Sequence, residues 1–374
     1  MRILMLNYEF PPLGGGAANA NGYLLAEFAS RENPEIDLVT SSPDGYREVE
    51  FSENTTIYKL DVSKETVHHW TQPEILRYSW KAYRKSRELL ADADYDLVHA
   101  WFGVPCGLIA RTLGLPYLVA LRGSDVPGYN DRFSWQYVGL KPLIRKTWKD
   151  AEAVVANSVG LRSLARETAA LPIEVIPNGV AVDEFTPTYH DRERLRVLCV
   201  SRLIERKGIR YLIEAIAKLN AELTIVGEGR REAALKSLTR ELGVENRVTF
   251  AGYVPHDAVH GYYEAADVFV LPSFNEGMSN TVLEALAAGL PIVTTDTGGT
   301  AELLEDNGHV VPAGDASAIA TAVRSYRNPE KRRVHGRRSR TIAEAMSWED
   351  VAAQYRTLYD RLCQPDRPRA PVHP

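Results

Sequence analysis

Glu276 and Glu284 are two carboxylates with seven residues between them, in the stretch NEGMSNTVLEALAAG. A capping box of Thr281 and Glu284 would explain only the second acid, and Ser279 or Asn280 are other capping candidates. Ionised carboxylates accept hydrogen bonds from hydroxyl groups. The pair therefore predicts a polyol site, with Glu284 on ribose hydroxyls and Glu276 on a sugar ring.

Two cations follow a strand candidate at residues 197–201: Arg202 comes directly after it, and Lys207 opens the helix pattern that follows. A cation at a helix N-terminus is disfavoured by the helix dipole, by a few tenths of a kcal/mol. An anion between the two cations would explain their placement. A diphosphate fits, because arginine binds it as a fork and lysine as a point charge. The alternative is two solvated cations beside Glu205.

Glycines follow two further strand candidates, as Gly14, Gly15 and Gly16 near the N-terminus and as Gly227 and Gly229 later in the chain. Glycines at such turns let a phosphate or a sugar approach the backbone, and a helix N-terminus follows the first run. A plain tight turn is the alternative. Neither run has the third glycine of GxGxxG, and GxxxxGK[ST] is absent from the sequence, so NAD binding is disfavoured.

Short apolar runs alternate with helix-period segments along the chain, which predicts parallel sheets covered by helices on both faces. Ligands of such sheets bind at the carboxyl ends of the strands, where the acids, cations and glycines fall. The runs form two series, which predicts two similar α/β domains. They lie at residues 3–6, 38–40, 97–99, 117–121, 153–156 and 174–176, then at 197–201, 223–226, 248–250, 268–271, 291–294 and 309–311.

The turn-rich stretch at residues 177–196 marks the junction between these domains. We place a first Rossmann-like domain at residues 1–183 and a second at 184–345. A last helix, at residues 346–363, has an apolar stripe that needs another surface to cover it. The proline-rich tail at 364–374 is predicted to be disordered. The stripe consists of Trp348, Val351, Tyr355, Leu358 and Leu362.

The composition excludes several classes of partner. The chain of 374 residues carries a net charge of −5, which argues against nucleic acid as the main partner. Its three cysteines are far apart and we see no clustered histidine or cysteine ligands, so neither a metal nor a redox site is predicted. The N-terminus does not read as a signal peptide, and apolar runs fall short of a membrane span. We expect a cytoplasmic protein, with peripheral contact at the inner face of the membrane left open.

The chain resembles the family 4 glycosyltransferases of the GT-B fold. The resemblance is carried by the Glu-x7-Glu pair in PSFNEGMSNTVLEALAAGLPIVTTDTGG, by SRLIERKG, by VIPNGVAVDEF and by PPLGGG. It implies two Rossmann-like domains with parallel sheets facing across a cleft, and a C-terminal helix that crosses back to the first. It also implies a retaining enzyme that moves a sugar from a UDP- or GDP-sugar to a hydroxyl of a saccharide, lipid-linked or small-molecule acceptor. Glycan or polysaccharide biosynthesis without a required metal is the expected setting.

The resemblance implies roles for single residues. Arg202 and Lys207 hold the diphosphate and stabilise it as it leaves. Glu284 binds the ribose, and Glu276 lies against the donor sugar. The family is described by same-face attack, in which a donor phosphate oxygen takes the acceptor proton, so Glu276 is not assigned as a nucleophile. The other expected donor contacts are Gly15, Gly16, Met278, Ser279 and Asn280.

One position departs from the family pattern. Many members read LHGSD where this chain has Arg122 in LRGSD, which puts a catalytic step by that histidine in doubt. Arg122 would instead bind an anionic acceptor or the donor phosphate, and Asp125 would orient an acceptor hydroxyl. A structural pair of Arg122 with Asp125 is the alternative. His99 is a substitute base only if it is not simply packed, which is the commoner state of a lone histidine.

Other functions stay open at this point. They are a phosphate-dependent GT-B phosphorylase, an NAD-dependent oxidoreductase and a non-catalytic binding protein. Residues 67–88 mix aromatic and basic side chains, which would suit a membrane surface and a lipid-linked acceptor. An ordinary helix with its aromatic side chains packed inward is slightly favoured. The side chains concerned are Trp70, Tyr78, Trp80, Tyr83, Arg77, Lys81, Arg84 and Lys85.

Overall fold

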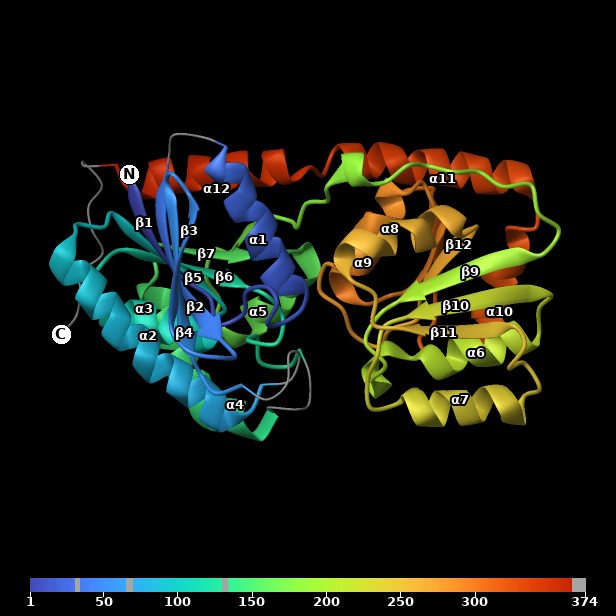
Figure 1. Ribbon diagram of the computed structural model, residues 1–374, viewed down its shortest axis with the longest axis horizontal. Helices are drawn as coiled ribbons and strands as arrows, with labels where there is room; N and C mark the ends of the chain where they lie inside the picture. Colours follow the sequence, from blue (N-terminus) through green and yellow to red (C-terminus); the bar gives the residue numbers. More distant parts are fainter. Residues whose placement is uncertain (31–33, 65–69, 130–133, 365–374) are drawn as a thin grey trace. The chain divides into compact units, whose positions relative to one another are not determined.

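A computed structural model describes residues 1–30, 34–64, 70–129 and 134–364 of the chain (Figure 1). The chain divides into two compact units. The N-terminal unit comprises Met1–Asn178 together with Trp348–Pro374, and the C-terminal unit comprises Gly179–Ser347. Apart from residue 364, the predicted disordered tail lies outside the described residues.

The N-terminal unit contains an eight-stranded sheet in which every pairing is parallel except that of β3 with β4. The six predicted strands of the first series are present. The two strands that the sequence reading missed, β3 and β4, lie at one edge, where an alternating pattern replaces the continuous apolar runs of buried parallel strands. The spatial order is β3 (Arg47–Ser52), β4 (Thr55–Asp61), β2 (Glu35–Ser42), β1 (Arg2–Leu6), β5 (Leu97–Trp101), β6 (Tyr117–Leu121), β7 (Ala153–Ala156) and β8 (Glu174–Val175).

Helices cover both faces of this sheet. Figure 1 shows α1 (Gly16–Ala29) and α12 (Trp348–Leu362) on one face, with α2 (Gln72–Asp92) and α3 (Leu108–Thr112) on the other. Two more helices complete the unit, α4 (Ser134–Asp150) and α5 (Val159–Thr168).

The predicted return of the last helix to the first domain is confirmed. Helix α12 belongs to the N-terminal unit and packs on α1, and all five residues of its apolar stripe are buried. Trp348 stacks on Tyr23 with 5.5 Å between ring centroids, and Tyr359 packs against Phe28. Aromatic packing of this kind stabilises through both buried area and ring geometry.

The C-terminal unit contains a six-stranded sheet, all of it parallel. Its order is that of a Rossmann-like domain, and the topological switch point lies between β9 and β12. All six predicted strands of the second series are present. The spatial order is β11 (Val248–Gly252), β10 (Ala221–Val226), β9 (Leu195–Val200), β12 (Val268–Leu271), β13 (Ile292–Thr295) and β14 (Gly308–Val311).

Two hydrophobic cores lie on the two faces of this sheet. Strand β12 serves both, because Val268 and Val270 enter one core while Phe269 and Leu271 enter the other. This is the alternation of a strand that is buried on both faces. The first core is closed by α6 (Ile209–Ala217), α7 (Glu232–Glu241) and α10 (Ala316–Ser325), and the second by α8 (His256–Ala265), α9 (Asn280–Ala287) and α11 (Pro329–Glu344).

One structural observation bears on membrane insertion. Among the residues that the structure describes, none of the helices combines the length and the apolar character needed to cross a bilayer.

Candidate active site

Lys207 and Glu276 meet at the switch point of the C-terminal sheet. Lys207 lies in a short turn after β9, and Glu276 lies in the loop between β12 and α9. The Nζ group of Lys207 donates a hydrogen bond to Oε1 of Glu276, and both residues are 9% exposed. Ser273 Oγ donates to the same oxygen at 2.7 Å. Two residues 69 positions apart therefore form one buried ion pair.

The expected place of Lys207 at the start of a helix was wrong. Lys207 does not open a helix, because it ends a 3-10 turn and α6 begins at Ile209. Gly208 between them has a φ of 62°, and a Cβ there would lie 2.1 Å from the carbonyl oxygen of Pro272. The anion next to Lys207 is Glu276 of the protein itself. Diphosphate binding by Lys207 and Arg202 stays a prediction, and Arg202 is exposed at the carboxyl end of β9.

The charge state of Glu276 follows from its neighbours. Burial alone would raise the pKa of this carboxyl, but the charges of Lys207 and Arg206 and the hydrogen bonds from Lys207 and Ser273 outweigh it and hold its pKa below the ordinary value. Burial lowers the pKa of Lys207, and Glu276 opposes that shift. Glu276 is thus an ionised acceptor that fixes the lysine in place.

The loop that carries Glu276 is tied to the loop after β9. The guanidinium group of Arg206 donates to the carbonyl of Asn275 at 3.0 Å, and Phe274 N donates to the carbonyl of Arg206 at 2.8 Å. These bonds cross between the two strand-exit loops on either side of the switch point. They fix the two loops, and with them Lys207 and Glu276, relative to each other.

Helix α9 begins where that loop ends. Its N-cap is Ser279, and Asn280 is its first residue. The predicted capping box of Thr281 and Glu284 is wrong, because Thr281 is already inside the helix. The first N–H groups of a helix lack intrahelical partners, and this end of α9 lies next to the loop of Glu276. The predicted donor contacts of Met278, Ser279 and Asn280 fall in this segment.

Glu284 is held by a side chain of another helix. Its Oε2 accepts a hydrogen bond of 2.6 Å from the hydroxyl of Tyr263 on α8. Burial raises the pKa of Glu284 to about 7, with the hydrogen bond from Tyr263 opposing that rise and the charge of Glu184 adding to it. Near neutral pH this carboxyl is poised between an acceptor and a donor of hydrogen bonds.

The predicted glycines divide into two kinds. Gly15 is the N-cap of α1, and a Cβ added there would meet nothing within 4 Å, so its backbone is open to approach. Gly16 is the first residue of that helix. Gly227 has a φ of 125°, and a Cβ there would lie 2.1 Å from the carbonyl oxygen of Ser201. Gly227 therefore lets two strand-exit loops pack closely, which is a sufficient reason for a glycine without a ligand.

Arg122 is engaged within the N-terminal unit. Its guanidinium group donates to Oδ1 of Asn178 and to the hydroxyl of Tyr355, both at 3.0 Å, and lies 3.6 Å from the ring centroid of Trp101. Tyr355 belongs to α12, so this cation joins the exit of β6 to the last helix. The geometry favours a structural role over binding of a phosphate.

Asp125 holds backbone rather than the arginine side chain. Its carboxylate accepts from the N–H groups of Gly103 at 2.7 Å and of Arg122 at 2.9 Å. It is buried, and burial raises its pKa against those bonds. The alternative of a structural pair of Arg122 with Asp125 is therefore present in one form: Asp125 binds the main-chain N–H of Arg122 within a turn.

His99 is a packed residue. It is fully buried, its Nδ1 lies 2.7 Å from the hydroxyl of Tyr359, and its ring stacks near Trp101. Burial, with the charge of Arg122 added, lowers its pKa well below the ordinary value. A neutral buried ring bonded to α12 fits the commoner state of a lone histidine.

Comparison with known proteins identifies the family. Residues 14–184 match the model of Glycosyltransferase Family 4, and residues 194–328 match that of Glycosyl transferases group 1. The lipopolysaccharide core biosynthesis glycosyltransferase of Rhizobium meliloti is 30% identical over 64% of this chain and 73% of its own length. The chain belongs to the family 4 glycosyltransferases.

Other relatives of this glycosyltransferase span nearly the whole chain. An uncharacterized glycosyltransferase of Methanocaldococcus jannaschii is 27% identical over 96% of this chain and 98% of its own. A GDP-mannose-dependent mannosyltransferase of Mycolicibacterium smegmatis, named for phosphatidylinositol monomannoside, is 28% identical over 86% and 88%. The structure of sucrose-phosphate synthase from Thermosynechococcus elongatus matches with a TM-score of 0.85 and 24% identity, over 97% and 99% of the two chains. The predicted GT-B class is confirmed.

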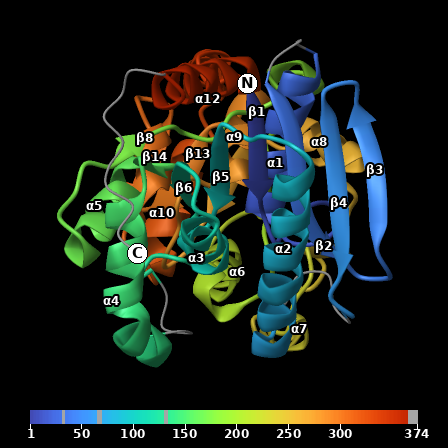
Figure 2. The same ribbon diagram turned by 90° about the vertical axis from the view of Figure 1, so that its left-hand side faces the viewer.

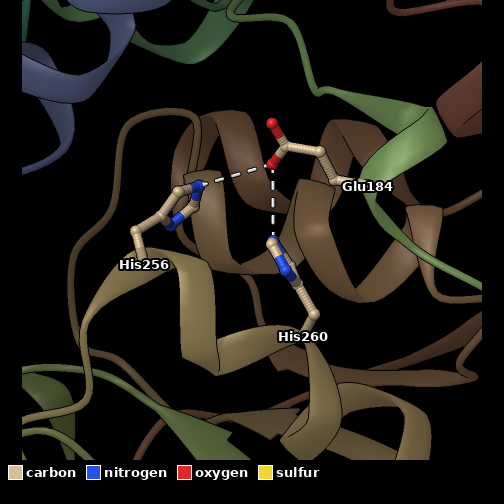
Figure 3. A group of neighbouring side chains, drawn as sticks. All are labelled: Glu184, His256 and His260. Carbon is tan, nitrogen blue, oxygen red and sulfur yellow. Dashed lines mark ion pairs between the residues drawn. The ribbon is translucent and has the colours of Figure 1, made fainter.

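One cluster in the glycosyltransferase was missed. Glu184, His256 and His260 lie together, with their ligand atoms within 4.8 Å of one another (Figure 3). The expectation of no clustered histidine ligands was therefore wrong. The signal was available in the stretch HDAVH, because residues four apart share one face of a helix. Its third member could not be read from the sequence, since Glu184 is 72 positions before His256.

Proposed function

We propose that this glycosyltransferase transfers a sugar, with retention of configuration, from a nucleoside-diphosphate sugar to a hydroxyl of a saccharide or lipid-linked acceptor. The observation that supports this most is the buried pair of Lys207 and Glu276 at the switch point of the C-terminal sheet. It places an ammonium group, an ionised carboxylate and the N-terminus of α9 at one sheet edge. Parallel α/β sheets bind nucleotides at that position.

The leaving group in this proposal is the nucleoside diphosphate. Its charge grows as the bond to the sugar breaks, and fixed positive groups lower the energy of that state most when they are already in place. Lys207 is held by Glu276, Arg202 lies at the exit of β9, and the N–H groups of α9 add a positive helix end. We propose that these groups supply the charge, so that the transfer step does not require a metal.

The proposed retention follows the same-face route. Glu276 is a poor nucleophile here, because its Oε1 already accepts from Lys207 and Ser273. A donor phosphate oxygen would take the proton of the acceptor hydroxyl while that hydroxyl attacks from the side of the leaving group. In this scheme Glu276 fixes Lys207 and accepts a hydrogen bond from the donor sugar.

A donor panel tests this function. The enzyme would be incubated with UDP- and GDP-sugars, including GDP-mannose, the donor named for the mycobacterial relative. Release of the nucleoside diphosphate is the readout. A separate reaction, with inorganic phosphate and a glycan in place of the donor, is assayed for sugar phosphate to detect a phosphorylase. We expect turnover of one donor class, reduced at least about 100-fold by Lys207→Met. Lys236→Met is the matched control, because Lys236 is a half-exposed lysine of the same unit paired with Glu232. Equal rates for the two variants would refute the role of Lys207.

We further propose that the acceptor is presented at an anionic membrane surface, and helix α2 supports this. Leu76 is 69% exposed and Trp80 is 58% exposed, and with Tyr83 they follow the spacing of one helical face. Arg84 lies 4.9 Å from the Trp80 ring centroid on the same face. By contrast, Trp70 and Tyr78 are buried, so the inward-packing alternative holds for half of the aromatics. Figure 2 shows α2 along the side turned to the viewer.

Flotation with vesicles tests the membrane part by itself. The wild type should float with vesicles rich in anionic lipid and not with neutral ones, and Leu76→Ser with Trp80→Ser should abolish flotation. A double change of Val310 and Val334 to serine is the control, since these side chains of the C-terminal unit are 47% and 52% exposed. Flotation that is absent in the wild type, or equal in both double variants, would remove the membrane contact without touching the transfer reaction.

A further inference from the structure

Three side chains of metal-ligating types converge in the C-terminal unit, near enough to the candidate site that the charge of Glu184 acts on Glu284. His256 opens helix α8, His260 follows one turn later, and Glu184 ends the 3-10 turn at Val182–Glu184 (Figure 3). Oε2 of Glu184 lies 3.8 Å from Nε2 of His256 and 3.4 Å from Nε2 of His260. One carboxylate oxygen thus faces two imidazole nitrogens.

The spacing of these atoms suits one shared ion. Two ligands that each bind zinc at about 2.0–2.1 Å in a tetrahedron lie about 3.4 Å apart. The two distances to Glu184 are close to this value, and the three ligand atoms all lie within 4.8 Å.

The surroundings of His260 orient it toward this point. Its ring packs edge-on against Phe185, with 4.7 Å between centroids. Its Nε2 is shielded from solvent, and among the described residues no hydrogen bond satisfies it. A buried nitrogen without a hydrogen bond is costly, and a metal ion is one partner that removes this cost. Its pairing with Glu184 as a salt bridge requires a protonated ring, whereas a metal takes the neutral ring.

We propose that Glu184, His256 and His260 bind one divalent transition-metal ion of the zinc class. Two imidazoles and one carboxylate form a borderline donor set that suits zinc and its neighbours rather than magnesium or calcium, which favour all-oxygen sites. A pair of histidines four apart on a helix presents both nitrogens on one face. The remaining coordination position is taken by water.

The ion would fasten the chain where it enters the C-terminal unit. Glu184 lies five residues after the start of that unit, whereas both histidines lie on α8, more than 70 positions away. A metal across these elements closes a long loop and ties the entry segment to the helix that also carries Tyr263, the partner of Glu284. We therefore expect metal to stabilise the C-terminal unit without contacting the reacting sugar.

Titration of the purified, metal-stripped full chain tests the site. Zn²⁺ and Mg²⁺ would be titrated at pH 7.5 by calorimetry and followed by thermal melts. We expect one Zn²⁺ per chain with a dissociation constant of micromolar or below, a rise in Tm of about 5 °C at a 100-fold excess over that constant, and no response to Mg²⁺ at the same concentration. Binding should weaken as the pH is lowered, because protons compete with a metal ion for imidazole nitrogens.

Variants assign the ligands. His256→Asn and His260→Asn should each reduce Zn²⁺ affinity at least 100-fold, while Glu264→Gln, which removes another carboxylate from the same helix, should leave it unchanged. Melts of the metal-free variants check that they fold. Cobalt substitution adds a spectrum: the proposed site shows d–d bands without a thiolate charge-transfer band. Unaltered binding in the histidine variants, a thiolate band from a cysteine such as Cys363, or no saturable binding by the wild type would overturn the proposal.

Discussion

The two units of this glycosyltransferase share a Rossmann-like sheet but use the charged residues at their strand ends differently. In the C-terminal unit, Lys207 and Glu276 follow two strands that adjoin the switch point, and their side chains meet. In the N-terminal unit, Arg122 and Asp125 also follow a strand, but they bind neighbouring backbone, an asparagine and the last helix. The same sequence signal, a charge after a strand, marks the proposed donor site in one unit and a structural contact in the other.

The difference comes from which strand the charge follows and what lies nearby. Strands β9 and β12 are adjacent in space but far apart in sequence, so their exit loops converge. Arg122 follows β6, which pairs with β5 in the N-terminal sheet. Its guanidinium group donates a hydrogen bond to Tyr355 of α12. The guanidinium group of Arg122 therefore makes its hydrogen bonds to Asn178 and Tyr355 within the unit.

Removal of Lys207 should have the largest effect on activity. Lys207→Met takes away a cation that is held in place before the diphosphate leaves, so we expect kcat to fall roughly 10²–10³-fold. The variant also leaves Glu276 buried without its partner, which destabilises the fold. Adding Glu276→Gln should restore part of the lost stability but none of the activity. Recovery of activity in the double variant would show that the pair is only structural.

Removal of Arg122 should instead lower stability. Arg122→Met loses two hydrogen bonds and the contact with Trp101, and we expect the free energy of unfolding to fall by on the order of 2–4 kcal/mol. Donor binding, measured by calorimetry with the nucleoside diphosphate, should stay within about twofold of the wild type. Arg122→Lys, which keeps the charge but not the planar fork, should be nearly as unstable. A stable variant without activity would reverse the comparison and make Arg122 catalytic.

Glu284 should give stability a pH dependence inside the C-terminal unit. Its pKa is about 7 when folded, against 4.5 as the ordinary value. A raised pKa contributes stability that is fully present below pH 4.5 and is lost as pH rises through 7. Glu284→Gln escapes this loss, so its advantage over the wild type should grow by on the order of 2–3 kcal/mol between pH 5 and pH 8. Denaturant melts at the two pH values measure this, and a constant difference would contradict the burial argument.

His99 should give the smallest effect, with the opposite sign. Its pKa is lowered on folding, so its contribution to stability is present above pH 6.5 and is lost as pH falls below that value. The wild type should lose up to about 1.4 kcal/mol per pH unit more than His99→Gln between pH 6.5 and pH 5.5. Equal slopes in denaturant melts would mean that the ring is protonated in the folded state.

Much of the fold was readable because buried parallel strands leave continuous apolar runs. The run at Val268–Leu271 predicted β12 to the residue, and the stripe from Trp348 to Leu362 predicted a helix that must find another surface. Strands β3 and β4, at one edge of the sheet, were missed because neither has a continuous apolar run. In REVEFS polar residues alternate with Val49 and Phe51, and nearly all of the strand is exposed, whereas TTIYKLD is partly buried but mixes polar and apolar residues.

The roles of the site residues were harder to predict from the sequence, because each role depends on a partner that is distant in the sequence. Lys207 and Glu276 were each chosen because they follow a strand. The sequence around either residue does not indicate that the two side chains bind each other. The capping box of Thr281 and Glu284 was wrong, although Ser279, the observed N-cap of α9, was among the candidates. The role of Arg122 depended on Tyr355, which is 233 positions away. Such pairings follow from topology rather than from any local pattern.

The most direct test of the account is a set of thermal melts with UDP, GDP, ADP, NAD and phosphate on the wild type and on Glu284→Ala at one pH. One nucleoside diphosphate at about 100 times its dissociation constant should stabilise the wild type by about 2.7 kcal/mol. That gain should largely disappear in the variant. Stabilisation by NAD or phosphate alone, or an equal nucleotide response in both proteins, would contradict a donor site at the switch point of the C-terminal sheet.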